Sequence, residues 1–574
     1  MADNPPSQST DHVPARRSTI LWAVLFTAIA AGRIVATYSV TSQGFDEPCH
    51  VAAGIELLDK GTYTLDPVHP PLFRYAVAVP LYLAGERYPT SGPAATSTDY
   101  NVVGDSILYD SGHYRRNLML ARLAVLPFLL FAVVVVFLWA RHEFGDYAAV
   151  MAVALFTTLP TVLAFSSLAY TDMTAASTQM AALFAFVLWL EKRSARSSIV
   201  LGVALGFALL AKLTALIFLP AAGLGIWITK WAVTRKSVAE QKPQLGSTIR
   251  QATMAALIAI TLLWGGYKFA IGRVREGMQL SAASMPSFQN FPTSLRGLAR
   301  NLVISDPLIP APALFRGLAE ASVLNHAPPD SYLFGKIKRG GWWYFFGVGV
   351  ATKSPLPFLF LTLVGFVALW PLARRRWSAA APGVAALAVL VATMGVKYNV
   401  GVRHVMVVFP LLAVVAGCGC AQLWRARKNW HFAPGILLLA LLTWQGISTL
   451  RSRHDYIAYF NELGGQDPSR ILVLGCDLDC GQDIFRLSDS LRARKISQLS
   501  LAVWSSADMS QMGLPSFTVP PPYTPVHGWV AVSLRSLRYG SVLHHAYPHD
   551  AYAWLDRYQP VEKIGSTIRL YYIP

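Results

Sequence analysis

Residues 118–140 read LMLARLAVLPFLLFAVVVVFLWA, and the only charged side chain in this run is Arg122. An α-helix rises about 1.5 Å per residue, so about 20 predominantly apolar residues cross the hydrocarbon core of a bilayer. The run therefore predicts a membrane-spanning helix. Composition supports the same conclusion, because 54% of the residues are hydrophobic and only 14% are charged, whereas a soluble domain carries about 25% charged residues.

Other apolar stretches extend this prediction along the chain, and they are 19–40, 148–165, 174–190, 252–271, 343–371, 379–396, 405–424 and 432–449. The stretch 199–229 is too long for one upright span, and Lys212 interrupts it. We therefore expect two short or kinked helices there, which meet near the outer face. The predicted fold class is membrane all-α, a polytopic bundle of about eleven transmembrane helices.

The basic residues indicate how the chain is oriented. The net charge of +18 could suggest a nucleic-acid partner, but these residues lie in short runs between the apolar stretches. The runs are 16–17, 192–196, 230–250, 374–376 and 425–428. Under the helix assignment above they all fall on one side of the membrane, which is then the cytoplasmic side. We therefore expect no nucleic-acid partner.

Three parts follow from this topology. They are a cytoplasmic polar N-terminus at 1–18, a transmembrane domain at 19–449 with long outer loops at 41–117 and 272–341, and an outer part at 450–574. In the outer part, residues 471–475, 499–504, 529–534 and 567–573 have the character of strands, and 484–494 and 550–557 that of helices. We expect a small extracytoplasmic α/β C-terminal domain there.

Candidate acidic residues follow the first predicted helix. Asp46 and Glu47 are adjacent in the sequence Gly-Phe-Asp-Glu-Pro-Cys-His, and carboxylates at a membrane interface are costly unless they are solvated, paired or functional. One of them could accept a proton as a general base; the alternative is a pair of solvated loop acids. Asp172 is a third candidate, although an acid in the first turn of a helix also stabilises the helix dipole.

Candidate basic residues lie in several outer segments. Basic groups can hold a phosphate, and arginine binds it through two parallel hydrogen bonds. Each of them could instead be a side chain that reaches the interface from an apolar helix. For His69 and Arg74, which lie on either side of Pro70 and Pro71, the alternative is a plain turn. The candidates are His69, Arg74, Lys212, Lys353, Arg403 and His404.

Several motifs, taken in order, resemble a known family. They are Asp-Glu-Pro-x-His-x-x-x-Gly at 46–54, His-Pro-Pro-Leu at 69–72, Gly-Trp-Trp-Tyr at 341–344, Lys-Ser-Pro at 353–355, Asn-x-Gly-x-Arg-His at 399–404 and Asp-Leu-Asp-Cys-Gly-Gln-Asp at 477–483. The set is similar to GT-C membrane glycosyltransferases, and more narrowly to bacterial protein O-mannosyltransferase-like (family 39) enzymes, which use polyprenyl-phosphate sugars. The resemblance implies a bacterial inner (plasma) membrane protein whose active site faces the periplasm or exterior.

The resemblance also assigns roles. It implies that Asp46 is the catalytic carboxylate with Glu47 as its companion, that Asp172 is a second acid, and that Arg403 suits the carrier phosphate. The chain departs from the family where Cys476 and Cys480 stand in place of a serine and a tryptophan. A separation of four residues makes a disulfide geometrically demanding, so we expect two free thiols.

The sequence therefore predicts a glycosyltransferase that moves a sugar from a polyprenyl-phosphate carrier to an acceptor hydroxyl at the outer face. Asp46 would deprotonate the acceptor, and Arg403, with Lys353 or His404, would hold the departing phosphate. The partners are the lipid-linked donor, membrane lipid, and a protein, glycolipid or wall-polymer acceptor.

No Walker or Rossmann glycine motif is present, so we expect no nucleotide site. No metal ligands are assigned, and a divalent metal at Asp46 and Glu47 is left open. One rival function is a lipid or glycan transporter or flippase, which would hold ionisable residues near the bilayer midplane. A second rival is a membrane scaffold whose tail binds a partner.

Overall fold

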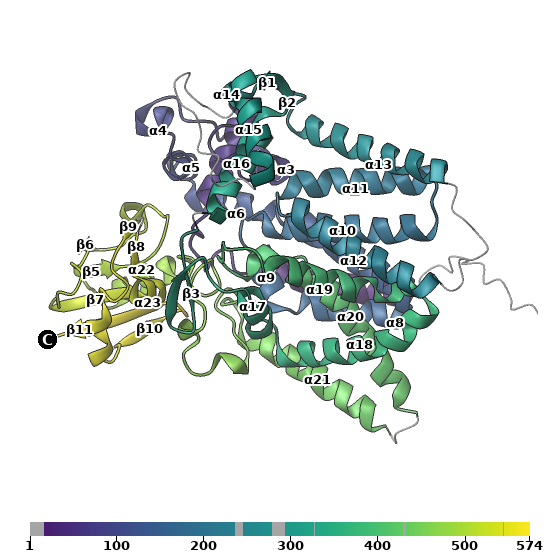
Figure 1. Ribbon diagram of the computed structural model, residues 1–574. Helices are drawn as coiled ribbons and strands as arrows, with labels where there is room; N and C mark the ends of the chain where they lie inside the picture. The colour runs from purple at the N-terminus through teal and green to yellow at the C-terminus, as the bar shows by residue number, and fades with distance from the viewer. Residues whose placement is uncertain (1–15, 236–244, 278–292, 327, 429–431, 544) are drawn as a thin grey trace, which may run out of the picture.

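The computed structural model describes residues 16–235, 245–277, 293–326, 328–428, 432–543 and 545–574. In this part of the chain, eight helical segments are long and apolar enough to cross a membrane. They are α1 (Arg17–Val35), α6 with α7 (Tyr114–Leu123 and Leu126–Phe144), α10 (Asp172–Glu191), α12 (Ala215–Thr234), α13 (Leu245–Gly266), α18 (Leu356–Arg375), α20 (Val408–Ala426) and α21 (Ala433–Arg451). The chain is thus a predominantly helical, multi-pass membrane protein (Figure 1).

Prolines and one lysine interrupt the remaining apolar stretches. Helices α8 (Asp146–Thr157) and α9 (Pro160–Ser166) meet at 64°, and together they could form a ninth span. Helix α17 (Phe345–Lys353) ends before Pro355, since proline excludes the helical conformation from the residue that precedes it. Two shorter apolar helices, α11 (Ala195–Ala211) and α19 (Ala381–Thr393), complete the bundle.

The break predicted near Lys212 is present, and it reverses the chain direction. Lys212 has an extended backbone between α11 and α12, and its ammonium pairs with Asp172 at the first residue of α10. At the far end of α12, Lys230 contacts the last turn of α10. At that same end Arg376, which follows α18, lies 3.3 Å from the Glu191 carboxylate. Helices α11 and α12 therefore run in opposite directions.

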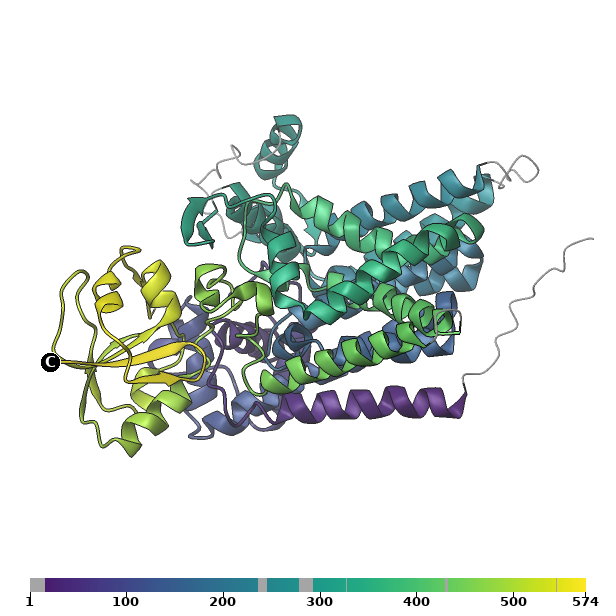
Figure 2. The ribbon, with the colours of Figure 1, turned by 90° about the horizontal axis from the view of Figure 1, so that it is seen from below.

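The two long loops predicted to be outer gather at one end of the bundle (Figures 1 and 2). Leu210, two residues before Lys212, packs there with Ala311 of the second loop. The first loop forms α2 (Glu47–Ile55), the π-helical turn η1 (Glu56–Lys60), α3 (Leu72–Leu83), α4 (Gly92–Thr96) and α5 (Tyr100–Tyr109). The second forms β1 (Ile271–Arg273), α14 (Val274–Gly277), α15 (Thr293–Ser305), β2 (Leu308–Pro310), α16 (Pro312–His326), β3 (Asp330–Leu333) and β4 (Lys336–Arg339).

The chain after α21 folds against the same end, around a sheet with strand order β10-β11-β7-β5-β6. Its strands are β5 (Gln498–Ala502), β6 (Ser516–Thr518), β7 (Gly528–Ser533), β10 (Glu562–Ile564) and β11 (Ile568–Ile573), with helices α22 (Ile484–Ala493) and α23 (Leu534–Tyr539). Strand β5 is parallel to β6 and β7, whereas β11 is antiparallel to β7 and β10. Buried Val162, Val402 and Leu487 belong to one apolar core, so this tail packs directly on the bundle.

Two predicted elements of the tail are wrong. Residues 471–475 do not form a strand, because the chain turns there: Gly475 has φ of +64° and Cys476 has φ of +63°. The helix expected at 550–557 is only the short 3₁₀ turn η9 (Ala553–Arg557). Gly475 also lies so close to the Val400 carbonyl that a Cβ atom could not fit.

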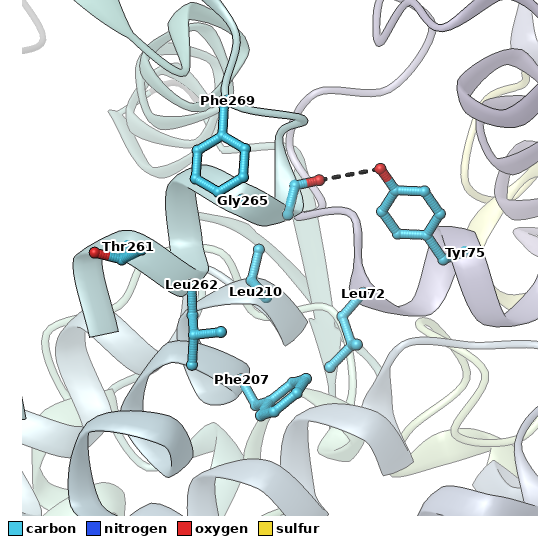
Figure 3. A pocket seen from close by; sticks show the side chains of 9 residues that line it. Leu72, Tyr75, Phe207, Leu210, Thr261, Leu262, Gly265 and Phe269 are labelled. Atoms are coloured by element: carbon cyan, nitrogen blue, oxygen red, sulfur yellow. Dashed lines mark hydrogen bonds between the residues drawn. The ribbon is translucent and has the colours of Figure 1, made fainter. Parts of the chain in front are cut away.

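An apolar cavity of about 310 Å³ lies between α3, α11 and α13 (Figure 3). Leu72 and Tyr75 come from α3, Phe207 and Leu210 from α11, and most of the remaining lining residues from α13. Because Leu210 is two residues before Lys212, the cavity lies at the same end of the bundle as the outer loops.

Candidate active site

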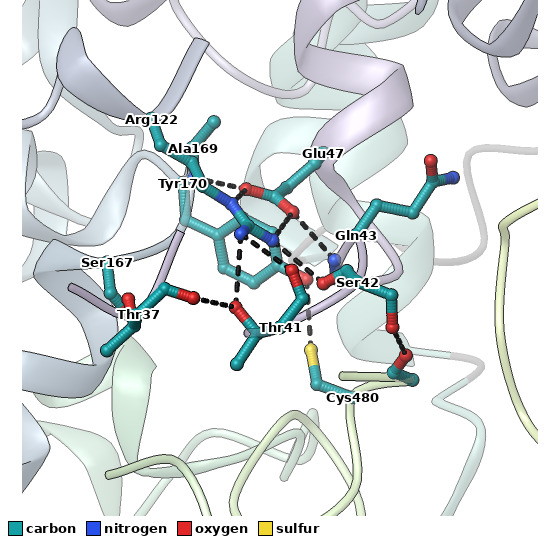
Figure 4. Close-up of polar contacts among 12 residues, drawn as sticks. Thr37, Thr41, Ser42, Gln43, Glu47, Arg122, Ser167, Ala169, Tyr170 and Cys480 are labelled. Atoms are coloured by element: carbon teal, nitrogen blue, oxygen red, sulfur yellow. Dashed lines mark hydrogen bonds and ion pairs between the residues drawn. The ribbon is translucent and has the colours of Figure 1, made fainter. Parts of the chain in front are cut away.

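The loop that follows α1 is fixed by a buried ion pair. Glu47 and Arg122 are both fully buried, and the Arg122 Nη2 atom lies 2.8 Å from Glu47 Oε2. Arg122 also donates to the carbonyl oxygens of Thr41 (3.0 Å) and Ser42 (2.8 Å). Figure 4 shows these contacts converging on one guanidinium. The single charge in the apolar run 118–140 therefore holds the loop that carries the candidate acids.

Asp46 stands at the end of this loop with its side chain 28% exposed. Its Oδ2 atom lies 2.6 Å from Arg403 Nη1, and its backbone N–H donates to the hydroxyl of Tyr170 (3.0 Å). The Arg403 guanidinium lies 5.0 Å from the centre of the Tyr170 ring. A Cβ atom at Gly44 would come within 2.9 Å of the Tyr170 hydroxyl, so glycine is needed for this close approach.

Four charged side chains, alternately acidic and basic, form a continuous row that begins at Asp46. Arg403 is 4.0 Å from Asp172 Oδ2, and Lys212 Nζ is 2.5 Å from Asp172 Oδ1. The structure thus brings together four predicted site residues, Asp46, Arg403, Asp172 and Lys212. Two positive and two negative charges balance, which lowers the cost of holding them away from water.

Arg403 and His404 share the short 3₁₀ turn η5 (Val402–Val405) in the loop between α19 and α20. Burial alone would lower the pKa of Arg403, but Asp46 and Asp172 raise it above its usual range. Burial, together with Lys212 and Arg403, holds the pKa of His404 well below its usual range. At neutral pH the guanidinium is therefore charged, whereas the imidazole is neutral and can accept or donate one hydrogen bond.

His69 and Arg74 belong to a neighbouring network. The fully buried Arg74 guanidinium donates to Asp66 and to the His50 ring, and His69 lies 2.9 Å from Asp66. Lys353 is directed toward the tail, where its ammonium donates to the backbone carbonyls of Ile457 (2.7 Å) and Asp477. His69, Arg74 and Lys353 therefore have protein partners outside the row of charges that begins at Asp46.

Two groups of residues near the charged centre carry side chains of the kinds that bind metals. Asp46 and Glu47 do not fit one jointly, since both Glu47 oxygens accept from Arg122 and the backbone N–H groups of Gly44 and Ala169. Cys49, His50 and Asp66 place one ligand atom each within 4.8 Å of the others. There the Arg74 guanidinium already supplies the positive charge. Neither group is thus a free metal site.

The predicted free thiols are wrong. Cys476 and Cys480 form a disulfide with Cα atoms 4.5 Å apart, because the left-handed backbone at Cys476 bends the chain back on itself. Tyr170 lies against this bridge, with its hydroxyl 3.4 Å from the Cys476 sulfur and 3.1 Å from the Cys480 sulfur. Tyr170 carried no assigned role in the sequence, although it directly precedes Thr171 and Asp172.

The fold and these residues define an integral membrane protein with a charged centre where its helices meet the outer loops. Residues 116–264 match the family model described as dolichyl-phosphate-mannose-protein mannosyltransferase. This match confirms the class that the resemblance predicted, a membrane glycosyltransferase. No curated protein matches the chain.

Among solved structures, the chain is similar to ArnT from Cupriavidus metallidurans bound to undecaprenyl phosphate, with 15% identity over 96% of this chain and 98% of that one (TM-score 0.46). It is also similar to the Archaeoglobus fulgidus oligosaccharyltransferase AglB in complex with an inhibitory peptide and a dolichol-phosphate, with 14% identity over 77% of this chain and 56% of that one (TM-score 0.44). The Saccharomyces cerevisiae Pmt1-Pmt2 complex bound to its sugar donor matches 44% of this chain and 33% of that one, at 17% identity (TM-score 0.33).

Proposed function

We propose that the protein transfers a sugar from a polyprenyl-phosphate carrier to an acceptor hydroxyl at the outer face of the membrane. The observation that carries this proposal is the contact between Asp46 and Arg403, a half-exposed carboxylate beside a cation. Transfer from a sugar phosphate requires a base for the acceptor and a cation for the leaving group. Asp172 and Lys212 extend the charged centre toward the membrane.

In the proposed reaction, the Asp46 carboxylate accepts the proton of the acceptor hydroxyl. The acceptor oxygen bonds to the anomeric carbon, and the bond from that carbon to the phosphate oxygen breaks. The electron pair leaves with the polyprenyl phosphate, whose growing charge Arg403 stabilises through two hydrogen bonds. The proton then passes from Asp46 to water.

The ion pair between Asp46 and Arg403 couples donor binding to the activity of the base. The Asp46 Oδ2 atom that would accept the proton is the atom that contacts Arg403. A donor phosphate would compete for Arg403 and release this oxygen. The carboxylate oxygen would thus be open to the acceptor hydroxyl when the donor is present.

The apolar cavity beside α11 could hold part of the isoprenoid chain. Leu210, which lines it, is two residues before Lys212 in the sequence, and Lys212 acts electrostatically on the His404 ring. An apolar chain in this cavity would place its phosphate near Lys212 and Arg403. Lys353, His69 and Arg74 then support the surrounding loops and the tail.

We also propose the topology that this reaction needs. Helices α11 and α19 would cross the membrane with the nine spans named above, which gives eleven crossings. Residues 1–18 would be cytoplasmic, 19–449 would form the catalytic transmembrane domain with outer loops 41–117 and 272–341, and 450–574 would be the outer domain. The protein would lie in a bacterial inner membrane and act on a protein, glycolipid or wall-polymer acceptor. A transporter is less well supported, since the acids lie at helix ends.

Sugar release tests this proposal without knowledge of the acceptor, because water can replace the acceptor slowly. Purified protein in nanodiscs would be given radiolabelled polyprenyl-phosphate hexoses and pentoses. Asp46→Asn should lower the rate of release about 10²–10⁴-fold without weakening donor binding, since the phosphate no longer competes with a carboxylate for Arg403. Asp489→Asn, at a side chain 71% exposed on α22, is the control and should match wild type. Activity of Asp46→Asn within a few-fold of wild type would contradict the proposal.

A further inference from the structure

A stack of three side chains joins the tail to the candidate active site. The Phe45 ring, next to Asp46, stacks on the Trp504 ring with 4.2 Å between their centres. The Arg535 guanidinium lies 3.8 Å from the centre of the same indole ring. Trp504 follows β5, and Arg535 is the second residue of α23. A guanidinium in contact with an indole through a cation–π interaction can still offer its N–H groups to a ligand.

The donors of this stack lack protein acceptors. Arg535 Nε and Trp504 Nε1 have no hydrogen-bond partner among the residues that the structure describes, and no described carboxylate forms an ion pair with Arg535. Asp479 is nearby, but its Oδ2 atom accepts from the backbone N–H of Arg535 (3.0 Å). Burial lowers the pKa of Arg535 to about 10, and Asp479, Tyr539 and Asp46 oppose this only in part. Both side chains are half-buried, and N–H donors that lack partners there are costly unless a ligand completes them.

The stack lies within electrostatic reach of the proposed catalytic centre. Arg535 interacts with both Asp46 and Arg403, and Tyr398 interacts with all three of these residues. Within the centre, Arg403 is balanced by Asp46 and Asp172. Arg535 therefore adds a positive charge that the centre itself does not neutralise, and it does so from the side of the tail.

We propose that Arg535 and Trp504 form an acceptor subsite that binds the anionic group, a carboxylate or a phosphate, of an acidic sugar. This inference rests on the proposed function. The donor phosphate is tethered to the membrane and approaches from the Lys212 side. An acceptor would reach Asp46 from the side of the tail, which supplies Arg535. The N–H donors of Arg535 and Trp504, beside an aromatic ring, suit the oxyanion of an acidic sugar. A hydroxyl of the same sugar would then face the carboxylate of Asp46.

Fluorine NMR can test the subsite without any transfer reaction. The full-length protein in nanodiscs would carry 5-fluorotryptophan, and Trp504→Phe would identify the resonance of position 504. Glucuronate, glucose 6-phosphate, glucose and an acidic tripeptide would be titrated in turn. We expect at least one acidic sugar to shift the Trp504 resonance saturably, and the one that does identifies the anionic group. Glucose should not shift it.

Variants of Arg535 then decide the role of its charge. Arg535→Gln should weaken binding of the acidic sugar about tenfold or more, and Arg535→Lys by less. Arg494→Gln, at a tail arginine that pairs with Glu562, is the matched control and should bind as wild type. Equal affinity of Arg535→Gln and wild type, equal binding of glucose, or binding of the tripeptide alone would each overturn the inference. Loss of sugar release in Asp46→Asn is measured separately, so either proposal can fail alone.

Discussion

Glu47→Gln should lower the stability of the protein before it affects the chemistry. Each Glu47 oxygen accepts one hydrogen bond from Arg122 and one from a backbone N–H, of Gly44 or Ala169, at 2.7–2.9 Å. A glutamine turned either way would place an amide N–H against two of these donors. It would also leave the buried guanidinium without its counter-charge. Breaking a buried pair in this way costs about 3–5 kcal/mol.

Thermal unfolding of the purified protein measures this cost. At about 2 °C per kcal/mol, Glu47→Gln should lower the melting temperature by about 6–10 °C. The double variant Glu47→Gln/Arg122→Met should recover part of this loss, since it no longer buries an unpaired charge. Glu562→Gln, in the half-exposed pair with Arg494, should shift it by about 2 °C or less. An unchanged melting temperature with lost sugar release would refute the structural role and assign Glu47 to the chemistry.

Three further predictions concern the phosphate site, pH and the disulfide. Arg403→Ala should weaken binding of a polyprenyl-phosphate analogue more than Arg403→Lys, because lysine keeps the charge without the two-pronged geometry; equal affinities of wild type and both variants in a titration would contradict it. Burial raises the pKa of Asp105 to about 7, so its contribution to stability is complete below about pH 4 and is lost as the pH rises through 7. The melting temperature of Asp105→Asn relative to wild type should therefore increase over that range, and a constant difference would disprove this. Replacing Cys476 and Cys480 with serine should lower sugar release, because Tyr170 loses its packing against the bridge; wild-type rates in the double variant would show that the bridge is dispensable.

The sequence predicts best those features that depend on local chemistry. The break at Lys212 was expected, because a charge in an apolar run acts on its own neighbourhood. The acids at the end of the first helix were found for the same reason. The stretch 343–371 was expected to be one span, which was wrong, since Pro355 divides it into α17 and α18. The false strand at 471–475 shows the limit of this approach, since apolar residues favour a strand but the positive φ of Gly475 excludes one.

Partners that are distant in the sequence could not be predicted. Lys353 was expected to hold the phosphate with Arg403, but its ammonium donates to carbonyl groups of residues 457 and 477 in the tail. Arg122 was visible as an isolated charge in a span, yet nothing local connects it to Glu47. Trp504 gave no signal of its own, because an aromatic residue in a small α/β domain usually belongs to its core.

The position of Asp46 depends on both the membrane bundle and the tail. From the bundle, Arg122 holds the neighbouring Glu47. From the tail, the backbone carbonyls of Cys480 and Gln482 accept from the N–H groups of Phe45 (3.1 Å) and Ser42 (3.0 Å). A carboxylate displaced by about 1 Å can lose 10²-fold in rate, so both anchors are needed to set the geometry. In the proposed mechanism the tail is therefore part of the active site, and the same docking that positions Asp46 also brings Arg535 to the proposed acceptor subsite.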